Sequence, residues 1–183
     1  LYVVAIDSGA REGELFALQW RDVDFAAKAI SITKTLQELD ATLVVKETKT
    51  PKSKRRLPLS DFAFEVLQDH RKRMLAESHY QPDAFVFCTA EGKPWFRSPL
   101  HRKSFKPILK NAGLPPIRFY DLRHTSATLL LLAGEPAKVA SERLGHSSIV
   151  LTLDTYSHVS EGMQKQATEK LDTFLRPRKT ITE

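Results

Sequence analysis

Apolar residues recur at the three- and four-residue spacing of amphipathic helices over most of the chain. Glycine follows several of these segments, at Gly9, Gly113, Gly134 and Gly145, which is typical of helix ends. Pro136 is expected in the first turn of its helix, where a missing N–H does no harm. The pattern predicts helices over residues 1–9, 11–20, 59–77, 98–114, 120–134, 136–145, 148–159 and 162–175.

Two further segments alternate apolar and polar residues and are rich in β-branched side chains, which is typical of strands. They cover residues 29–37 and 41–50, so we expect a small antiparallel sheet or hairpin within residues 29–59, with the basic stretch TPKSKRR as its turn. The segment AFVFC predicts a short buried strand, in which Cys88 is a small buried hydrophobe rather than a nucleophile. The fold class is therefore mainly α with a small antiparallel β-sheet (α+β).

The composition indicates a class of partner through its charge alone. The 183 residues include 28 Lys and Arg against 22 Asp and Glu, a formal net charge of +6. This charge favours a polyanion, and nucleic acid ranks ahead of an anionic membrane surface. No stretch approaches the roughly 20 apolar residues of a membrane span, and a single cysteine excludes a disulfide within the chain. We expect one domain of a soluble, intracellular protein, and a fragment of a longer chain because the first residues read as the inside of a helix.

Several residues are candidates for chemistry. Tyr156 has enough apolar neighbours to be buried, so core packing and catalysis fit its position equally well. His146 lies in the turn RLGHSS, which is a poor place for core packing. Arg123 begins a very apolar helix, where either a phosphate or a carboxylate would satisfy it. Arg11 stands between two apolar helices with Glu14 one turn later, and an ion pair between these two is the simplest interpretation.

The order of these segments along the chain is more specific than any one of them. A lysine in the basic turn could also reach a phosphate as a point charge, although such turns are usually solvated loops. The segments GAREGEL, KTPKSKRRLPL, YDLRHTSATLL, LGHSS and DTYSHV together resemble the catalytic domain of the tyrosine recombinases, the phage-integrase family of DNA strand-exchange enzymes. The resemblance covers nearly the whole chain and implies the tyrosine-recombinase catalytic-domain fold.

The resemblance implies a role for each matching residue. Arg11 and Arg123 would hold the non-bridging oxygens of the scissile phosphate, and Glu14 would brace Arg11. Tyr156 would attack the phosphorus to give a 3′-phosphotyrosine, while His146 would hydrogen-bond a phosphate oxygen. Because the covalent link conserves the energy of the phosphodiester, neither a nucleotide cofactor nor a metal is implied.

Two positions in the motifs need separate treatment. Lys49 ranks first as the general acid for the 5′ leaving oxygen because of its spacing to LPL, and Lys52 and Lys54 are neighbours that could be mistaken for it. Tyr120 stands where the family usually has a histidine. A phenol cannot act as a base near pH 7, but its O–H can donate a hydrogen bond to phosphate, so we expect activity with altered base catalysis.

The implied partner is double-stranded DNA at a recombination site. The residues expected to contact its backbone are Lys52, Lys54, Arg55, Arg102 and Lys103. The whole chain, 1–183, would be the catalytic domain, and nothing in it matches the family's N-terminal core-binding domain. The helix and tail over 161–183 are expected to contact a neighbouring protomer of a DNA-bound homotetramer or their own domain. The implied setting is bacterial, cytoplasmic and nucleoid-associated.

Two rival functions stay open at this point. A non-catalytic DNA-binding module would explain PAKVASERLGHSSIVLTLD as a helix-turn-helix, but it leaves Arg11, Lys49 and Arg123 without a role. A type IB topoisomerase-like enzyme would use the same tyrosine chemistry to relax supercoils rather than to exchange strands. The motif spacings favour the recombinase.

Overall fold

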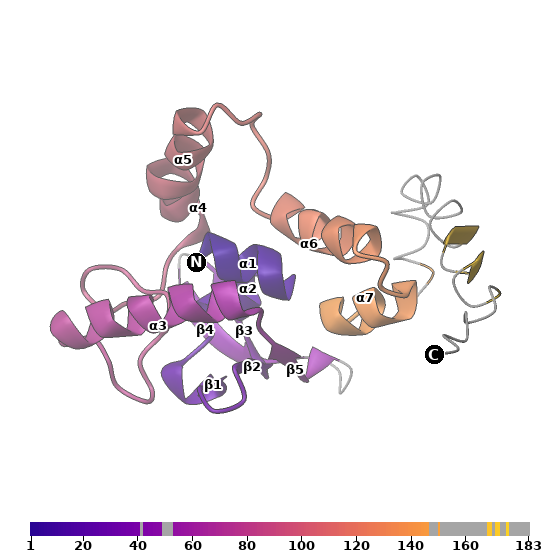
Figure 1. The fold of residues 1–183 in the computed structure, drawn as a ribbon. Helices are drawn as coiled ribbons and strands as arrows, with labels where there is room; N and C mark the ends of the chain where they lie inside the picture. Colours follow the sequence, from indigo (N-terminus) through magenta and orange to yellow (C-terminus); the bar gives the residue numbers. More distant parts are fainter. Residues whose placement is uncertain are drawn as a thin grey trace.

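The fold combines helices with two small antiparallel sheets (Figure 1). The computed structural model describes residues 1–40, 42–48, 53–146, 150, 168, 169, 171, 172 and 175. The α-helices are α1 (Tyr2–Ser8), α2 (Glu12–Phe16), α3 (Asp61–Ala76), α4 (Arg97–Leu100), α5 (Lys106–Asn111), α6 (Asp121–Leu132) and α7 (Ala137–Leu144). A 3₁₀ helix, η1 (Trp20–Asp22), and a π-helical turn, η3 (His101–Phe105), accompany them. The strands are β1 (Val23–Asp24), β2 (Ala29–Ile32), β3 (Lys34–Leu39), β4 (Thr42–Glu47) and β5 (Arg55–Pro58).

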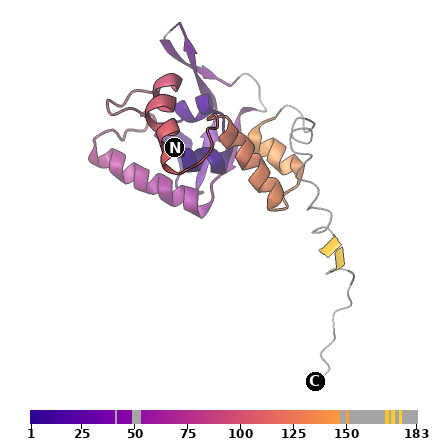
Figure 2. The same ribbon diagram turned by 90° about the horizontal axis from the view of Figure 1, so that it is seen from above.

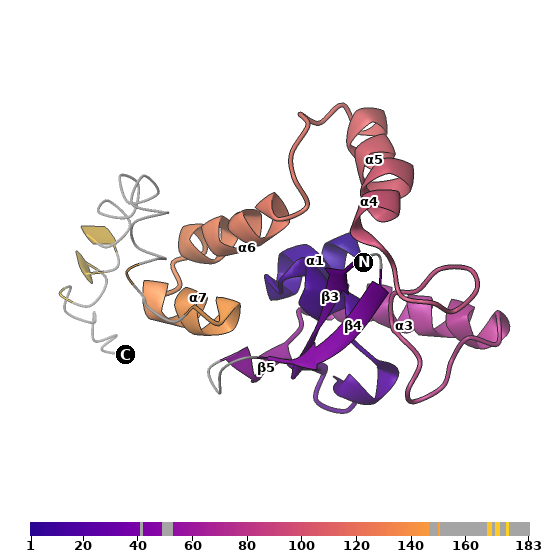
Figure 3. The ribbon, with the colours of Figure 1, turned by 180° about the vertical axis from the view of Figure 1, so that it is seen from behind.

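The strands divide into a three-stranded sheet and a separate hairpin. In the sheet, β2 lies between β1 and β5, and Ile30 is paired with Leu57. In the hairpin, Leu36 of β3 is opposite Val45 of β4. The hairpin projects from the body of the molecule (Figure 2) and lies on the face that is turned toward the viewer in Figure 3. The predicted α+β class is confirmed. Residues 29–59 contribute to two sheets rather than to the single one expected. The alternation of apolar and polar residues continues from β2 into β3, although the two strands pair with different partners.

Three helices meet at the end of α1, since α1 packs against α6 and α6 packs against α7. Gly9 ends α1 with φ 61°, in the left-handed region that favours glycine. A Cβ at Gly9 would lie 2.6 Å from Leu144 Cδ2 and 2.9 Å from Ser126 Oγ, so this close approach also requires glycine. The other glycines predicted to follow helices also have positive φ, at Gly113, Gly134 and Gly145.

The helix predicted over 11–20 is shorter than expected. Its regular part ends with α2, because the backbone that follows pairs with a distant segment. The Val86 N–H donates to the Leu18 carbonyl at 2.8 Å, and the Trp20 N–H donates to the Ala84 carbonyl at 3.1 Å. A tertiary pairing therefore replaces the helix that the local pattern predicts.

Other elements differ in detail. The short strand predicted at AFVFC is replaced by isolated bridges, and Cys88 in this segment is half-buried against the core rather than fully buried. The basic helix predicted over 98–114 is present as α4, η3 and α5 in succession. Pro136 is the N-cap of α7, one position before its first turn, where a φ of −58° suits proline equally well.

One large core contains buried residues of α1, α2, α3 and the three-stranded sheet. A smaller cluster joins α6 to α7 through Ala127, Leu131, Ala140 and Leu144. Each fully buried leucine in such a cluster contributes about 1.5–3 kcal/mol relative to an exposed one. Among the described residues, no helix is long and apolar enough to cross a membrane. The helices predicted over 148–159 and 162–175 lie largely outside the described residues.

Candidate active site

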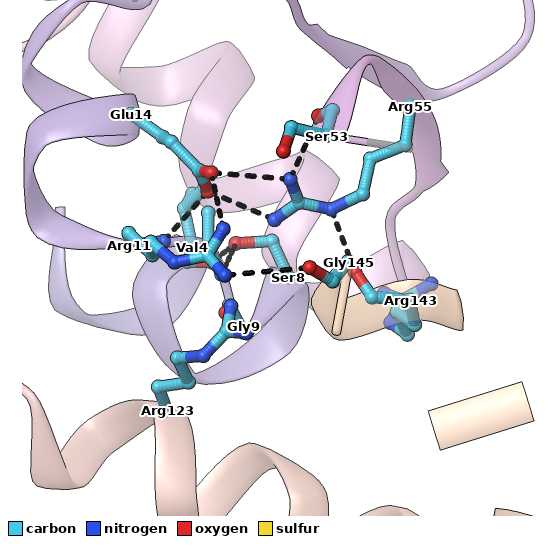
Figure 4. Close-up of polar contacts among 11 residues, drawn as sticks. Val4, Ser8, Gly9, Arg11, Glu14, Ser53, Arg55, Arg123, Arg143 and Gly145 are labelled. Carbon is cyan, nitrogen blue, oxygen red and sulfur yellow. Dashed lines mark hydrogen bonds and ion pairs between the residues drawn. The ribbon is translucent and has the colours of Figure 1, made fainter. Parts of the chain in front are cut away.

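Four charged side chains from separate parts of the chain meet beside the end of α1 (Figure 4). Arg11 and Glu14 come from the start of α2, Arg55 from the start of β5, and Arg123 from the first turn of α6. Glu14 and Arg123 are almost completely buried, each with 3% exposure. The fold thus brings together the two arginine motifs that the sequence analysis singled out.

Glu14 holds Arg11 through two contacts. Its Oε2 accepts the Arg11 backbone N–H at 2.8 Å, and its Oε1 accepts from Arg11 Nη1 at 2.9 Å. Burial by itself would raise the pKa of Glu14, but hydrogen bonds and positive charge from Arg55 and Arg11 bring its pKa below the ordinary value. The contact expected between Glu14 and Arg11 is therefore present, with Glu14 as a carboxylate.

Arg55 lies inside the fold, not on the exposed surface of the basic turn where a DNA-backbone contact was expected. Its side chain is 8% exposed. Its Nη2 donates to Glu14 Oε2 at 2.8 Å and its Nη1 to Glu14 Oε1 at 3.2 Å. Its Nε donates to the Arg143 carbonyl at 2.8 Å. The expectation for Arg55 is corrected on this point, because the guanidinium is turned to protein acceptors and screened from solvent.

Arg123 is a buried cation with incomplete hydrogen bonding. Its Nη1 donates to the Gly9 carbonyl at 2.7 Å, whereas Nε and Nη2 are buried and have no hydrogen-bond partner in the described structure. Among the described residues Arg123 makes no ion pair. A carboxylate partner, one of the two that the sequence left open for Arg123, is therefore not supported. Burial, followed by the charge of Arg11, lowers the pKa of Arg123 to about 10, which leaves it protonated at neutral pH.

His146 lies in the field of these arginines. It follows Gly145, which ends α7 with φ 68° and whose carbonyl accepts from Arg11 Nη2 at 3.3 Å. Burial, and then the charges of Arg123 and Arg11, lower the pKa of His146 to about 4. The imidazole is consequently neutral near pH 7 and can donate one hydrogen bond without carrying charge.

Tyr120 stands at the rim of the same region, as the N-cap residue of α6. The residue is 47% exposed, and its ring meets that of His124 edge-on, with ring centroids 4.9 Å apart. Tyr120 and Arg11 both line a groove of about 530 Å³. The phenol is thus placed at an open surface, and its predicted contact with phosphate stays a prediction.

The other predicted site residues fall into two groups. Lys54 is half-exposed and pairs with Glu47 at 2.8 Å, and Arg102 and Lys103 are exposed on η3. These positions suit contact with a DNA backbone. The residues that lie outside the described part of the chain are Lys49, Lys52 and Tyr156.

The arrangement suits a tetrahedral oxyanion. The side chain of Arg11 is 42% exposed and can reach a ligand, and the unpaired N–H groups of Arg123 are costly to bury unless an anion accepts them. A phosphate provides both negative charge and acceptor oxygens in the geometry that guanidinium groups match. Among the described residues, no group of three or more His, Cys, Asp or Glu side chains could hold a metal ion.

The internal position of Arg55 was not predicted from the sequence. A signal was available, because strand residues two apart share a face and Arg55 precedes the buried Leu57 by two positions. The neighbouring Arg56 points outward and pairs with Asp24 on the surface. Nothing in the sequence predicts the hydrogen bonds from arginines to the carbonyls of Gly9 and Gly145, because they depend on how the helices pack.

Comparisons with known sequences agree with this picture. The chain matches the Phage integrase family over residues 1–163. A tyrosine recombinase XerC-like protein of Caldanaerobacter subterraneus subsp. tengcongensis is 34% identical, over 96% of this chain and 49% of the relative. The ICEBs1 integrase of Bacillus subtilis is 32% identical, over 95% of this chain and 48% of the relative. The chain spans about half the length of these relatives.

Solved structures have the same fold. The Tn1549 transposon integrase in complex with a circular intermediate DNA aligns with a TM-score of 0.77 at 24% identity, over 93% of this chain and 57% of that chain. The XerA recombinase aligns with a TM-score of 0.69 at 24% identity, over 96% of this chain and 57% of that chain. At this level of identity the likeness shows the fold, and it is the fold that the sequence motifs implied.

Proposed function

This chain belongs to the phage integrase family, and we propose that it is the catalytic domain of an integrase-like, site-specific DNA recombinase that cleaves and rejoins strands through a 3′-phosphotyrosine. One observation carries the proposal most directly. The buried guanidinium of Arg123 has two unpaired nitrogens, and it lies in one cluster with the half-exposed Arg11. Two such cations suit the non-bridging oxygens of a phosphodiester, whose negative charge increases in the transition state.

The covalent step uses Tyr156 as the nucleophile. Its phenolic oxygen forms a bond to phosphorus while the bond from phosphorus to the 5′ oxygen breaks, and Lys49 gives a proton to that leaving oxygen. A tyrosine has an ordinary pKa of about 10, so the positive field of Arg11 and Arg123 favours release of its proton to solvent water during the attack. The phosphotyrosine retains the energy of the phosphodiester, so rejoining requires no energy cofactor.

The neighbouring groups assist by hydrogen bonding. His146, neutral because its pKa is about 4, donates to a phosphate oxygen. Tyr120 donates through its O–H from the rim of the groove that it shares with Arg11. Neither group acts as a strong base near pH 7, so the cations supply most of the stabilisation of the transition state.

The proposed partner is double-stranded DNA. Lys54, Arg102 and Lys103 are exposed cations that would contact its backbone in a salt-sensitive, largely sequence-independent way. We assign Lys52 to the same surface from its place in the basic turn. The solved Tn1549 integrase was determined with circular intermediate DNA, which supports the same class of partner here.

The remaining proposals concern the whole protein. Residues 1–183 would be the catalytic domain, and a core-binding domain elsewhere in the full-length protein would complete a clamp around DNA. Residues 161–183 would contact a neighbouring protomer in a DNA-bound homotetramer. The relatives are bacterial, and we propose a cytoplasmic, nucleoid-associated protein.

The test is trapping of the covalent intermediate. Full-length protein is incubated with nicked duplex DNA from the flanks of its source element, and denaturing electrophoresis with peptide mass mapping detects the adduct. We expect an adduct at Tyr156 in the wild type and none with Tyr156→Phe. Tyr80→Phe, which removes a hydroxyl from a half-buried tyrosine beside Trp20, is the matched control and should form the adduct.

The possible failures have distinct meanings. Tight DNA binding without an adduct would contradict the proposal and favour the non-catalytic DNA-binding module. An adduct with relaxation of supercoils but no joining of two duplexes would favour the type IB topoisomerase-like enzyme.

A further inference from the structure

Arg55 has no role in the chemistry described above. It is nevertheless the less exposed of the two arginines that pair with Glu14. We propose that Arg55 is a positioning residue, which neutralises and anchors Glu14 so that the guanidinium of Arg11 keeps its charge and direction for the scissile phosphate. The proposal rests on the proposed function. It adds a residue that does not bind the phosphate itself but acts on a residue that does.

The hydrogen bonds to Glu14 are the first support. Arg55 contacts both carboxylate oxygens, through Nη2 to Oε2 at 2.8 Å and through Nη1 to Oε1 at 3.2 Å (Figure 4). Arg11 shares the same two oxygens through its backbone N–H and its Nη1. A planar guanidinium that holds both oxygens fixes the plane of the carboxylate, and the carboxylate in turn fixes Arg11.

Charge is the second support. Glu14 is 3% exposed, so water does not screen it, and a buried carboxylate takes its compensation from the nearest cations. With Arg55 present, one arginine offsets Glu14 while Arg11 and Arg123 remain as surplus positive charge. Without Arg55, Arg11 becomes the only ion-pair partner of the carboxylate among the described residues, and its charge is no longer available in full to a phosphate.

The rest of the Arg55 environment excludes direct contact with DNA and explains its fixed position. The side chain is 8% exposed, and its Nε and Nη1 also donate to the carbonyls of Arg143 and Ser53. A Cβ on Gly145 would lie 3.2 Å from Arg55 Nη1. Arg55 therefore joins the end of α7, the basic turn and the start of α2, and acts on the phosphate only through these groups.

The first experiment compares Arg55→Gln with Arg56→Gln in the full-length protein. Both variants lose one positive charge from the same strand, but Arg56 is 55% exposed and pairs with Asp24 on the surface. We expect Arg55→Gln to slow single-turnover cleavage of nicked DNA about 100-fold, the size of effect seen when one preorganised donor is removed, with a change in DNA Kd no larger than that of Arg56→Gln. Cleavage by Arg55→Gln as fast as by Arg56→Gln would overturn the proposal.

A second variant separates a charge role from a loss of packing. Adding Glu14→Gln to Arg55→Gln removes the carboxylate that would otherwise neutralise Arg11, so the double variant should cleave about tenfold faster than Arg55→Gln. A double variant no faster than the single one would contradict the charge argument. If Arg55→Gln does not fold, Arg55→Lys takes its place: lysine keeps the charge but not the fork, and cleavage as fast as wild type would contradict the need for both contacts.

A spectroscopic measurement does not depend on cleavage. Burial, then the charges of Arg123 and Arg11, and to a smaller extent those of His124 and Arg55 lower the pKa of His146, so NMR titration of that imidazole reports the surplus charge once the charge at position 55 is kept constant. Arg55→Lys keeps the charge at this position but not the two contacts with Glu14, so in Arg55→Lys the pKa of His146 should rise toward its ordinary value, and in Arg56→Gln it should not move. If the wild type forms no adduct, the proposed function fails, whereas an unchanged His146 titration in Arg55→Lys means that the positioning role fails.

Discussion

The protonation state of His146 is set by its neighbours. Burial and the charges of Arg123 and Arg11 lower its pKa to about 4, against an ordinary value of 6.5. In the unfolded chain the same imidazole titrates near its ordinary value. Between these two pH values the unfolded state binds a proton that the folded state does not.

This difference predicts how stability depends on pH. Because the unfolded state binds more protons in that window, the free energy of unfolding should fall as the pH is lowered from about 6.5 toward 4, and the contribution should be constant above 6.5. His146→Gln lacks this contribution, so it should lose less stability than the wild type between pH 7 and pH 4.5 in urea unfolding. Acidic groups such as Glu14 titrate alike in both proteins and cancel in the comparison. Equal losses in the two proteins would contradict the neutral state assigned to His146.

Individual site residues were predictable to different degrees. Arg11, Glu14 and Arg123 stand in motifs of local sequence, and the structure brings them together. For Arg55 the sequence predicts a surface position, because a run of basic residues in a turn is usually solvated. Its true position depends on which face of β5 turns inward, and that is decided by pairing with β2 rather than by the turn itself.

At the scale of elements, the ends of helices hold the arginines. The Gly9 carbonyl follows α1 and accepts from Arg123, and the Gly145 carbonyl follows α7 and accepts from Arg11. Carbonyl groups at helix C-termini lack intrahelical partners, and the helix dipole favours cations there. The same contacts therefore complete two helix ends and orient two functional side chains.

Gly9→Ala is expected to disturb both roles of the α1 end. A positive φ costs a side-chain-bearing residue about 1 kcal/mol, and the added Cβ would also overlap Leu144 and Ser126 at 2.6 and 2.9 Å. Gly113→Ala is the matched control, because its φ is 66° and nothing lies within 4 Å of its added Cβ. We expect Gly9→Ala to lose about 2–4 kcal/mol of unfolding free energy and Gly113→Ala about 1 kcal/mol. Chemical denaturation measures both, and equal losses would contradict the packing argument.

Elements were predicted well where the local pattern decides and poorly where pairing decides. The lengths of α3 and α6 follow from periodicity, and Ser60 caps α3 by accepting from the Ala63 N–H. The segment of alternating apolar and polar residues that includes β2 and β3 does not indicate that these strands belong to two different sheets. Hydrophobic periodicity reports which side chains are buried, not which strand lies alongside.

At the scale of the whole molecule, the candidate site is assembled from segments that are far apart in sequence. Arg143 fastens α7 to the rest of the fold, with Nη2 donating to the carbonyls of Asp7 and Pro58 at 2.9 and 2.8 Å. Its ion pair with the Asp7 carboxylate adds a third contact to the same junction. The position of His146 beside the arginines therefore depends on the packing of α7 against α1 and β5.

The incompletely bonded guanidinium of Arg123 also means that this fold is not at its stability optimum. A buried charged group with unsatisfied hydrogen-bond donors lowers the stability of a protein, so Arg123→Met should unfold at a higher temperature than the wild type while its strand cleavage is lost. Calorimetry of the DNA-free proteins measures the first effect, and a lower melting temperature for Arg123→Met would refute it. Selection for strand cleavage would then have retained a residue that selection for thermal stability alone would replace. Thermostabilised variants of this enzyme should therefore be screened for loss of the Arg123 cation.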